Sequence, residues 1–558
     1  MLKSLSRRQR HTSPGGLRFV AVSGTTSVTE NFYVYEYGDE MLVVDCGIGF
    51  SENEAYGADL MLPDFSYVAT LKKRLRGILL THGHEDHIGA VPYLLKELKS
   101  KPDVYASPLT IGFVREKFKE HGLDSGVLKA FNPDNASLTL GSFKITPFRV
   151  THSVPDSVGY FIETPEGNLV HVSDFKFDWT PVDGKTFDTK KLSALSSRGV
   201  LAMTSDCLGS TSPGYTQSEQ SVKARINSIF DGSHGRIFFT TISSNISRMQ
   251  QAIEVAERHG RKVVFVGRSI ENKTEIARSL NQLVVKKSQV ISQNQARNYR
   301  DSELCYIISG SYGQARSSLF RVVNGEHSTL SFKQSDTVIF SADPAPPGSK
   351  EKVDALIDKL FQAGVGVYYY DIQEDLHVSG HGSQEDIKML LGLVKPRWAI
   401  PIGGTIRHMK AYEDLVTKHG QIGKKRVLRL LPGMAAELST QRAVRRQVYR
   451  PKSALLSGDG ETVISGETIE RRKQLSASGV LAISAGLGGG RLVNIGFAQS
   501  GLSGPLEERR SSALRKKLGE IEAGGLTRSE LTKKMVQTAK KHFSTKNGNS
   551  PVILVVVR

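Results

Sequence analysis

The sequence is poor in cysteine and has no long apolar run. Its 558 residues include only 3 cysteines, which lie far apart at Cys46, Cys207 and Cys305 and so argue against a disulfide framework. No apolar run in the chain approaches the roughly 20 residues that a membrane-spanning helix needs. These absences exclude a disulfide-stapled secreted domain and a helical membrane protein, and they predict a cytoplasmic location.

The first 16 residues contain neither an acidic side chain nor an apolar core. Lys3, Arg7, Arg8 and Arg10 make the stretch basic, but a secretory signal would also need a hydrophobic segment. We therefore expect residues 1–16 to form a disordered basic tail.

Acidic residues are also scarce relative to basic ones. The chain has 74 Lys and Arg against 56 Asp and Glu, and its formal net charge is +18. Residues 441–558 hold 21 basic and 9 acidic residues, so +12 of the +18 lies in this last part. Such a balance favours a polyanionic partner, and nucleic acid is the first candidate.

The first 175 residues alternate short β-rich runs with turns. Residues 32–37 and 41–45 are two such runs around a Gly-Asp turn, which is a good hairpin signal. Another run at residues 76–80 leads into a histidine-rich loop and then into a helical pattern. Strands with helices between them predict a layered α/β sandwich over residues 17–205.

The pattern changes over residues 206–350. Helical stretches at residues 220–226 and 247–259 alternate with β-rich runs at 237–241 and 262–267. This alternation predicts parallel βαβ units, and hence an inserted α/β domain.

Beyond residue 350 we expect the chain to return to the first domain. The return segment would comprise residues 351–440 and begin with a strand at 366–370. We expect a linker at residues 441–460 and a small C-terminal α/β domain at 461–558. The glycine cluster at 486–490 has no strand–GxGxxG–helix context, so we expect a loop there rather than a phosphate cradle.

The most informative stretch follows the apolar run that ends at Leu80, and it reads Thr81-His82-Gly83-His84-Glu85-Asp86-His87. His82 and His84 are alternate residues of a loop and can turn toward one point, while Asp86 and His87 can face a neighbouring point. Mixed nitrogen and oxygen ligands suit Zn²⁺ first and Mn²⁺ as an alternative. Two metals about 3.5–4 Å apart can clamp the attacking and leaving oxygens of a hydrolysis. The stretch therefore predicts a metallohydrolase.

One loop cannot complete the ligand spheres of two metals, so other strand ends must contribute. His152 follows an expected strand at residues 143–150, and Asp174 follows another at 168–172. Asp174 is a candidate for a carboxylate that bridges the two metals.

In this order, the histidines and aspartates resemble those of the metallo-β-lactamase superfamily, and the inserted domain resembles that of its β-CASP branch. Over nearly its whole length the chain resembles the ribonuclease J family. Besides the metal-binding loop, the stretches that carry this resemblance are Asn31-Phe32-Tyr33-Val34-Tyr35-Glu36-Tyr37, Thr151-His152-Ser153-Val154-Pro155-Asp156-Ser157, Ser173-Asp174-Phe175-Lys176-Phe177-Asp178, Ser205-Asp206, Pro213-Gly214-Tyr215-Thr216, Ser244-Asn245, Gly267-Arg268-Ser269, Ser309-Gly310-Ser311, Asn324-Gly325-Glu326-His327 and His377-Val378-Ser379-Gly380-His381.

The resemblance implies a metallo-β-lactamase αββα sandwich with an inserted β-CASP α/β domain and a small C-terminal α/β domain. It implies metal-dependent hydrolysis of RNA phosphodiester bonds in RNA processing and decay. The substrate would be single-stranded RNA with a 5′ monophosphate, degraded from that end and sometimes cut internally. Two Zn²⁺ per chain, with Mn²⁺ or Mg²⁺ as alternatives, and a homodimer or homotetramer are also implied.

The resemblance further implies roles for individual residues. His82, His84, His152 and Asp174 would bind a first metal, and Asp86, His87 and Asp174 a second. The loop of His377, Val378, Ser379, Gly380 and His381 would bind a substrate phosphate through backbone N–H groups and the Ser379 hydroxyl. His381 would be the general acid, Asp86 would also act in catalysis, and Asp206 would orient a metal ligand.

One departure from the family pattern concerns the second metal. The family usually has a Pro-x-His-Gly-Glu stretch that supplies the last metal-binding histidine, and the matching residues here are Pro401-Ile402-Gly403-Gly404-Thr405. Since Gly403 has no side chain, the second metal should bind more weakly by at least about 10–100-fold. His408 is a candidate substitute, and Tyr312, Gln314 and Ser247 also depart from the pattern.

Two alternatives to an active ribonuclease stay open. Gly403 motivates a catalytically weakened RNA-binding subunit that works beside an active homologue. A β-CASP nuclease that acts on DNA would share the metal-binding loop, although the stretches outside this loop favour RNA.

Overall fold

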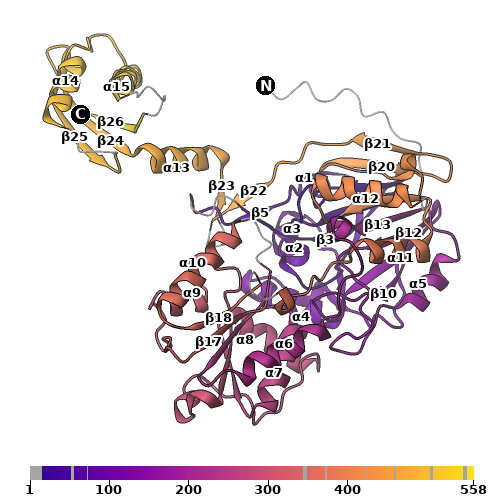
Figure 1. Cartoon of the computed structure of the whole chain (residues 1–558). Coiled ribbons are helices and arrows are strands. Elements are labelled where there is room, and N and C mark those ends of the chain that lie inside the picture. The colour runs from indigo at the N-terminus through magenta and orange to yellow at the C-terminus, as the bar shows by residue number, and fades with distance from the viewer. Residues whose placement is uncertain are drawn as a thin grey trace. The chain divides into compact units, whose positions relative to one another are not determined.

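Figure 1 shows a computed structural model of the chain. It describes residues 16–558 apart from residues 52–55, 72, 344–347, 371–373, 420–421, 458–459, 461, 503–506 and 544–549. The chain divides into two compact units, one containing the residues up to Phe50 with Met61–Ser453, and one containing Ser51–Leu60 with Ala454–Arg558. The basic tail expected at residues 1–16 lies outside the described residues except for Gly16.

Two β-sheets build the centre of the larger unit. The first consists, in spatial order, of β21 (Ala443–Gln447), β20 (Met434–Leu438), β1 (Leu17–Ala21), β2 (Phe32–Tyr37), β3 (Glu40–Cys46), β6 (Arg74–Leu79), β7 (Val104–Ala106) and β8 (Leu128–Ala130). The second consists of β19 (Trp398–Ile402), β13 (Ala202–Asp206), β12 (Gly167–Val172), β11 (Val158–Thr164), β10 (Phe143–Arg149) and β9 (Leu138–Leu140).

Strand β21 corrects part of the expected linker at residues 441–460. It pairs antiparallel with β20 at the edge of the first sheet, where Arg445 and Arg446 are exposed. Charged side chains are common on edge strands because they stay in water and discourage pairing with other chains. Arg445 and Arg446 therefore belong to an edge strand rather than to a linker.

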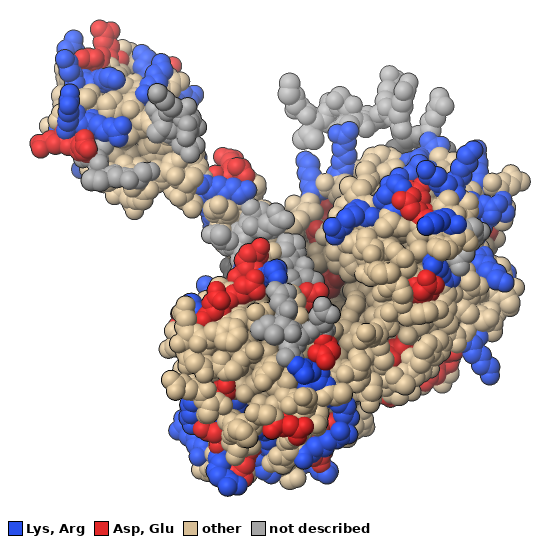
Figure 2. Space-filling model, viewed as in Figure 1, with Lys and Arg blue, Asp and Glu red and all other residues tan. Residues whose placement is uncertain are grey.

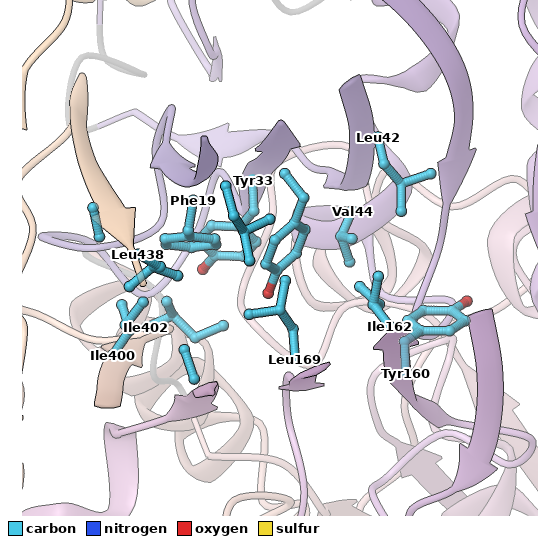
Figure 3. Close-up of a cluster of buried hydrophobic side chains, with 14 of the residues drawn as sticks. Phe19, Tyr33, Leu42, Val44, Tyr160, Ile162, Leu169, Ile400, Ile402 and Leu438 are labelled. Carbon is cyan, nitrogen blue, oxygen red and sulfur yellow. The ribbon is translucent and has the colours of Figure 1, made fainter. Parts of the chain in front are cut away.

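The inner faces of the two sheets share one apolar core. In β10 the buried side chains of Phe143 and Ile145 alternate with the exposed Lys144, which is the period of a strand with one face on a core. Figure 3 shows side chains from both sheets meeting, with Phe19, Tyr33, Leu42 and Val44 from the first sheet and Tyr160, Ile162, Leu169, Ile400 and Ile402 from the second. Burial of these side chains holds the two sheets together as layers.

Helices cover the outer faces of both sheets. Behind the second sheet lie α5 (Thr189–Ser196), α11 (Gln384–Val394) and α12 (Ile406–Lys418), whose apolar residues share a core with the outward side chains of that sheet. Beside the first sheet lie α2 (Glu85–Ile88), α3 (Val91–Glu97) and α4 (Pro108–Glu120) (Figure 1). This arrangement confirms the expected αββα sandwich.

The inserted domain has a five-stranded sheet of its own. All its strands are parallel, in the order β15 (Lys262–Val266), β16 (Leu304–Ile308), β14 (Ile237–Thr240), β17 (Thr337–Phe340) and β18 (Gly366–Tyr368). The helices that alternate with them are α6 (Gln220–Asp231), α7 (Ile246–Arg258), α8 (Arg268–Ser279), α9 (Ser318–Val323) and α10 (Ser349–Gln362). The βαβ pattern expected from the sequence is confirmed.

The end of this inserted domain differs from the expectation. We expected the return to the first domain to start at residue 351, with a strand at 366–370. Instead, β18 pairs with β17, and α10 contributes Val353, Ile357 and Leu360 to the core of the inserted domain. A helix followed by a strand has the same sequence pattern in either domain. Only the strand with which β18 pairs shows to which domain it belongs.

Parallel pairing brings several loops to one edge of the second sheet. Strands β12, β13 and β19 run parallel. Asp206 of β13 lies opposite Ile402 of β19, and the residue before Asp206 lies opposite Val172 of β12. Because parallel strands end at the same side of a sheet, Asp174, Asp206 and Gly403 emerge close together.

The first sheet delivers its own loop in the same way. Strands β3 and β6 are parallel, with Val44 opposite Leu79. Asp45 at the end of β3 therefore lies beside Thr81 at the start of the histidine-rich loop, and Asp45 Oδ1 accepts the Thr81 N–H at 2.8 Å.

The smaller unit contains a three-stranded sheet. Its central strand β24 (Val480–Gly488) pairs antiparallel with β25 (Arg491–Ser500) and parallel with β26 (Val552–Val557). Helices α14 (Glu508–Gly519) and α15 (Arg528–Phe543) pack on it, and α13 (Gly466–Ser478) precedes it. The loop expected at residues 486–490 is shorter than predicted, because β24 continues through Gly488 and only Gly489 and Gly490 form the turn.

Within the described ranges of both units, no helix combines the length and the apolar character needed to cross a bilayer. This agrees with the absence of long apolar runs in the sequence.

Candidate metal centre

The first group of candidate ligands contains two histidines of the loop after β6, His82 and His84. His152, which follows β10, and Asp174, which follows β12, complete it. Nε2 of His82 and Nε2 of His152 each lie 3.1 Å from Nδ1 of His84. Oδ2 of Asp174 lies 3.6 Å from the His82 nitrogen and 3.7 Å from the His152 nitrogen. Ligands bound to a tetrahedral metal at about 2.0–2.1 Å are roughly 3.3 Å apart, so these four atoms have the spacing of a metal site.

The protein also holds the outer nitrogen of each histidine. The partners are Thr81 Oγ1 for His82 (3.0 Å), Ser153 Oγ for His84 (3.2 Å) and the carbonyl oxygen of Gly380 for His152 (2.7 Å). Such contacts fix the ring orientation and leave the inner nitrogen for a metal. A Cβ at position 380 would lie 2.5 Å from His152 Cε1, so this approach requires glycine.

A second group shares Asp174 with the first. Nε2 of His87 lies 3.3 Å from Asp174 Oδ2 and 3.5 Å from Asp86 Oδ2. The same Asp174 oxygen thus faces both groups. On its other side His87 donates from Nδ1 to Asp45 Oδ2 at 2.8 Å, in a contact that is fully buried.

An amide side chain contacts the second group. Nδ2 of Asn31 lies 3.0 Å from His87 Nε2 and 3.3 Å from Asp86 Oδ2. The hydroxyl of Tyr33 donates to the other end of this amide, Asn31 Oδ1, at 2.7 Å. Asn31 is therefore fixed in place between a strand and two candidate ligands.

Gly403 lies at the border of the second group. Its φ of 68° falls in the left-handed region, and its N–H donates to the Gly24 carbonyl at 2.8 Å. A Cβ at this position would lie 3.4 Å from Asp206 Oδ1 and 3.9 Å from Asp174 Oδ1. A side chain at position 403 would therefore start beside the carboxylate that both groups share.

His408 does not take the place of the side chain that Gly403 lacks. Its Nδ1 accepts the Thr405 N–H at 3.2 Å, at the start of α12. It belongs to none of the metal-capable groups that the described residues form. The expectation that His408 substitutes as a ligand is wrong, because capping engages its Nδ1 and its Nε2 lies 3.5 Å from a guanidinium nitrogen of Arg407.

Asp206 contacts His381. Nδ1 of His381 lies 2.7 Å from Asp206 Oδ2, and its Nε2 lies 3.9 Å from Asp174 Oδ2. We expected Asp206 to orient a metal ligand, but among the described residues its carboxylate holds His381 and the Leu208 N–H. It therefore positions the residue that the resemblance makes the general acid.

The expected phosphate loop, residues 377–381, is partly open to solvent. Ser379 is exposed, and its hydroxyl accepts the His381 N–H at 3.1 Å. The side chain of His381 is 20% exposed, so it can reach a ligand. Val378 is buried at 8% exposure, so its side chain faces the interior rather than a ligand.

The histidines of the centre differ in pKa, because burial dominates at some of them and nearby carboxylates dominate at others. Burial lowers the pKa of His82 and of His152 well below the usual range, so both are neutral, as metal ligands must be. Burial acts in the same direction on His87, but Asp174 and two further carboxylates outweigh it and raise the pKa. In the metal-free protein, His87 therefore carries the proton that balances these carboxylates.

His381 is also protonated at neutral pH. Burial alone would lower its pKa, but the carboxylates of Asp206 and Asp174 outweigh burial and raise the pKa to about 9. The imidazolium at this site can release a proton at an accessible ring nitrogen.

The donor atoms fit metal ions. The first group offers three imidazole nitrogens and one carboxylate oxygen, a set that suits Zn²⁺. The second group offers one imidazole and two carboxylates, which is a harder set of ligands. The metal ligands expected from the sequence thus lie together in two adjacent groups.

Sequence patterns missed several residues that support this centre. Asp45 is an acid at the end of a buried strand with a φ of 59°, and this unusual conformation is invisible in the sequence. Asn31 is distinguished in the sequence only as the first residue of a stretch, 31–37, that resembles the family. Lys176, Glu219 and Arg248 are buried behind the phosphate loop, and their positions depend on contacts between distant segments.

Three family models match the chain. The metallo-β-lactamase superfamily matches residues 26–206, and the ribonuclease J β-CASP domain matches residues 234–360. The Zn-dependent metallo-hydrolase RNA specificity domain matches residues 370–427. The matched regions contain, respectively, the histidine-rich loop, the strands β14 to β17 of the inserted sheet, and the phosphate loop.

Full-length relatives are similar over most of the chain. Ribonuclease J 1 of Streptococcus pyogenes is 36% identical over 468 residues, which cover 84% of this chain and 82% of that protein. Ribonuclease J of Thermus thermophilus is 33% identical over 551 residues, which cover 97% and 95%. Ribonuclease J2 of Bacillus subtilis is 34% identical over 467 residues, which cover 84% and 83%.

Among solved structures, an Enterococcus faecalis protein of unknown function has the same fold. It aligns with a TM-score of 0.53 at 12% identity and covers 77% of this chain and all of that one.

We predict that the proton on His381 depends on Asp206. Because the folded-state pKa of His381 is raised from 6.5 to about 9, its contribution to stability is complete below pH 6.5 and is lost as the pH rises through 9. In metal-free protein, Asp206→Asn should lower the His381 pKa and remove this loss, as measured by the unfolding midpoint between about pH 6 and 10.

Asp336→Asn is the matched control, because Asp336 is a buried carboxylate paired with Arg236 rather than with a histidine. It should lower the midpoint equally across this pH range. An unchanged slope in Asp206→Asn would contradict the assignment.

Proposed function

The chain belongs to the ribonuclease J family, and on that premise we propose that it is a metal-dependent ribonuclease that hydrolyses phosphodiester bonds of single-stranded RNA. The observation that carries this proposal is the position of Asp174. Its Oδ2 lies 3.6–3.7 Å from nitrogens of His82 and His152 and 3.3 Å from a nitrogen of His87. One oxygen between two ligand groups is suited to a pair of ions that acts on a phosphate.

The residues around that pair of ions have different roles. When bound, two metal ions supply Lewis acidity, which lowers the pKa of a water and neutralises phosphate charge. Asp86, whose side chain is 18% exposed, accepts a hydrogen bond from the incoming water. The Ser379 hydroxyl and backbone N–H groups of the loop, that of Gly380 among them, bind the phosphate oxygens. His381, held by Asp206, gives its proton from Nε2 to the leaving oxygen.

The finer assignments follow the family. We propose that the enzyme removes nucleotides from a 5′-monophosphate end in the 5′-to-3′ direction, with internal cleavage as a second mode. Zn²⁺ is our first choice of metal, and Mn²⁺ or Mg²⁺ are the alternatives. A homodimer or homotetramer is the proposed assembly.

The basic C-terminal part supports a polyanionic substrate. Residues 441–558 hold 21 of the 74 basic residues and only 9 of the 56 acidic ones. Lys and Arg side chains lie on the surface of the smaller unit, which Figure 2 shows in blue. Contacts of this kind are electrostatic, so RNA affinity should fall as salt concentration rises.

Gly403 supports a second candidate function, a weakened RNA-binding subunit that works with an active homologue. A Cβ at this position would lie 3.9 Å from Asp174 Oδ1, and glycine provides no ligand there. Against this reading, the candidate ligands His82, His84, Asp86, His87, His152 and Asp174 are all retained.

The main proposal predicts RNA cleavage that depends on the first ligand group. Purified protein supplied with Zn²⁺ or Mn²⁺ should degrade 5′-monophosphorylated RNA faster than 5′-triphosphorylated RNA. His82→Ala should reduce the rate by at least about 100-fold, because a lost metal ligand costs more than a lost partner of a ligand. Gel analysis of end-labelled RNA measures both rates, and intact 5′-monophosphorylated RNA with both proteins would overturn the proposal.

Substitutions at position 403 separate the two candidate functions. Gly403→His should tighten binding of the second metal by about 10–100-fold in calorimetric titrations, because it adds an imidazole beside Asp174. Gly403→Ala is the control, because it has the same strain at a φ of 68° but adds no ligand.

Equal metal affinity in the two variants would refute the ligand role of this position. If the wild type cleaves RNA poorly and Gly403→His restores fast cleavage, the weakened-subunit reading is the correct one.

A further inference from the structure

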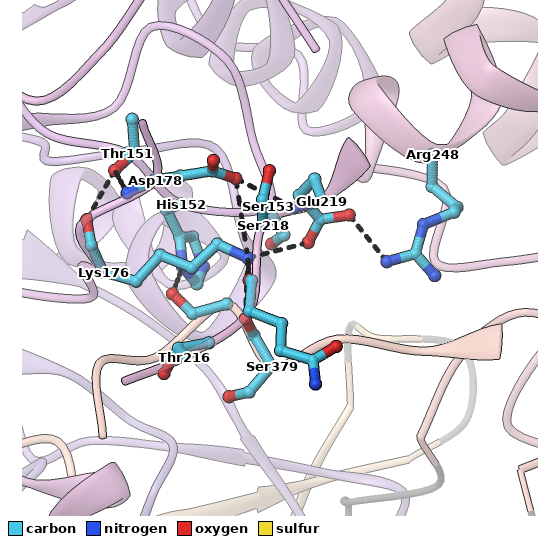
Figure 4. A network of polar contacts seen from close by, with 12 residues as sticks. Thr151, His152, Ser153, Lys176, Asp178, Thr216, Ser218, Glu219, Arg248 and Ser379 are labelled. Carbon is cyan, nitrogen blue, oxygen red and sulfur yellow. Dashed lines mark hydrogen bonds and ion pairs between the residues drawn. The ribbon is translucent and has the colours of Figure 1, made fainter. Parts of the chain in front are cut away.

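Three charged side chains are buried together behind the phosphate loop. The side chains of Lys176 and Arg248 have no exposed area, and that of Glu219 is 3% exposed. Glu219 lies between the two cations, with Oε1 3.3 Å from Lys176 Nζ and Oε2 accepting from Arg248 at 2.6 Å (Figure 4). Burying three charges is unfavourable unless each is paired and hydrogen-bonded, so this arrangement calls for an explanation.

The two cations also hold the phosphate loop from its inner side. Lys176 Nζ donates to the carbonyl oxygen of Ser379 at 3.0 Å, and Arg248 donates to the carbonyl oxygen of Leu376 at 3.0 Å. The Ser341 hydroxyl donates to the same Leu376 carbonyl at 2.7 Å. One cation therefore holds a carbonyl just before the loop, and the other holds a carbonyl within it.

The held carbonyl groups determine where the N–H groups of the loop point. In a trans peptide the C=O and the N–H point in opposite directions. The Ser379 carbonyl points inward to Lys176, so the N–H of Gly380 points away from that buried cation. The next carbonyl, that of Gly380, is held by the candidate metal ligand His152 at 2.7 Å. The loop conformation is thus fixed both by the buried charges and by the metal centre.

The network connects segments that are far apart in the sequence. Lys176 follows β12 in the first domain, and Glu219 directly precedes α6. Arg248 lies on α7 of the inserted domain. A second contact strengthens the link, because the backbone N–H of Glu219 donates to Asp178 Oδ2 at 2.9 Å. The inserted domain therefore reaches the loop through Arg248.

We propose that Lys176, Glu219 and Arg248 are positioning residues that hold loop 377–381 in the conformation that binds the substrate phosphate. They act through the loop and do not touch the reacting atoms. This inference rests on the proposed function, because it takes phosphate binding as the role of the loop. It predicts that the three residues matter for RNA and much less for a small phosphodiester that depends on the metals alone.

A second buried arginine provides a matched control. Arg236 also lies in the inserted domain and pairs with a buried carboxylate, Asp336, at 3.0 Å from Nε. It donates in addition to the Ser331 carbonyl, which lies outside the phosphate loop. Arg236→Met and Arg248→Met both remove a buried cation, but only Arg248→Met releases the loop.

The test compares two substrates and the metal content of each variant. Arg248→Met and Lys176→Met should lower kcat/KM for 5′-monophosphorylated RNA by about 10–100-fold, mainly by raising KM, since a misplaced binding group has an effect of this size. Hydrolysis of bis(p-nitrophenyl) phosphate and the bound metal per chain should stay within about 3-fold of wild type, well below that effect. Arg248→Lys should recover part of the RNA activity. Arg236→Met should leave the ratio of the two activities unchanged.

Other outcomes overturn the proposal. If Arg248→Met and Arg236→Met change the two activities alike, or if metal is lost with the RNA activity, the network has only a structural role. Glu219→Gln keeps the shape and some hydrogen bonds of Glu219. It is the variant to measure if any of the others fails to fold. Hydrogen exchange over residues 374–383 should quicken in Glu219→Gln, and unchanged exchange would count against the proposal. Wild-type protein that cleaves neither substrate would instead refute the proposed function itself.

Discussion

The carboxylate of Asp174 is the contact on which the rest of this centre depends. Its Oδ2 lies within 3.7 Å of ring nitrogens from His82, His152 and His87. Burial would raise the pKa of this carboxyl, but His87 and His381 hold the pKa well below its usual range. Asp174 is therefore a charged acceptor at the point where two ligand groups meet. The parallel register of β12, β13 and β19 brings that acceptor to the same edge as Asp206 and Gly403.

The two ligand groups around Asp174 are not equivalent. The first has three imidazoles, and a polar contact holds each outer nitrogen. The second has His87 and Asp86, with Asn31 in contact with both and Gly403 at its border. A family member with this centre is expected to bind its first metal tightly and its second metal weakly.

Much of the centre could be predicted from the sequence because its signals are local. The loop from Thr81 to His87 is a single continuous stretch, and His152 and Asp174 follow recognisable strands. The fold class was also predictable, since the period of strands and helices changes where the inserted domain begins. The sequence places β18 in the wrong domain and β21 in a linker. A strand can be predicted from the sequence, but the strand with which it pairs cannot.

The supporting residues could not be predicted because their partners are distant in the chain. Asp45 meets His87 across 42 positions, and Lys176 meets the Ser379 carbonyl across 203. A lysine after a strand or an arginine on a helix is ordinarily a surface residue. Only the folded arrangement places Lys176 and Arg248 on the two oxygens of Glu219. His408 is a different case, because its partner Thr405 is only three residues away and the contact depends on the capping geometry at the start of α12.

Calorimetric metal titration of Asp174→Ala tests the central claim most directly. Because one oxygen of Asp174 faces both groups, removing it should weaken both binding events, whereas His152→Ala should weaken only the first. Two weakened events in Asp174→Ala beside one in His152→Ala is the result that we predict. If Asp174→Ala weakens a single event and leaves the other at its wild-type affinity, the two groups do not share this carboxylate and the account is wrong.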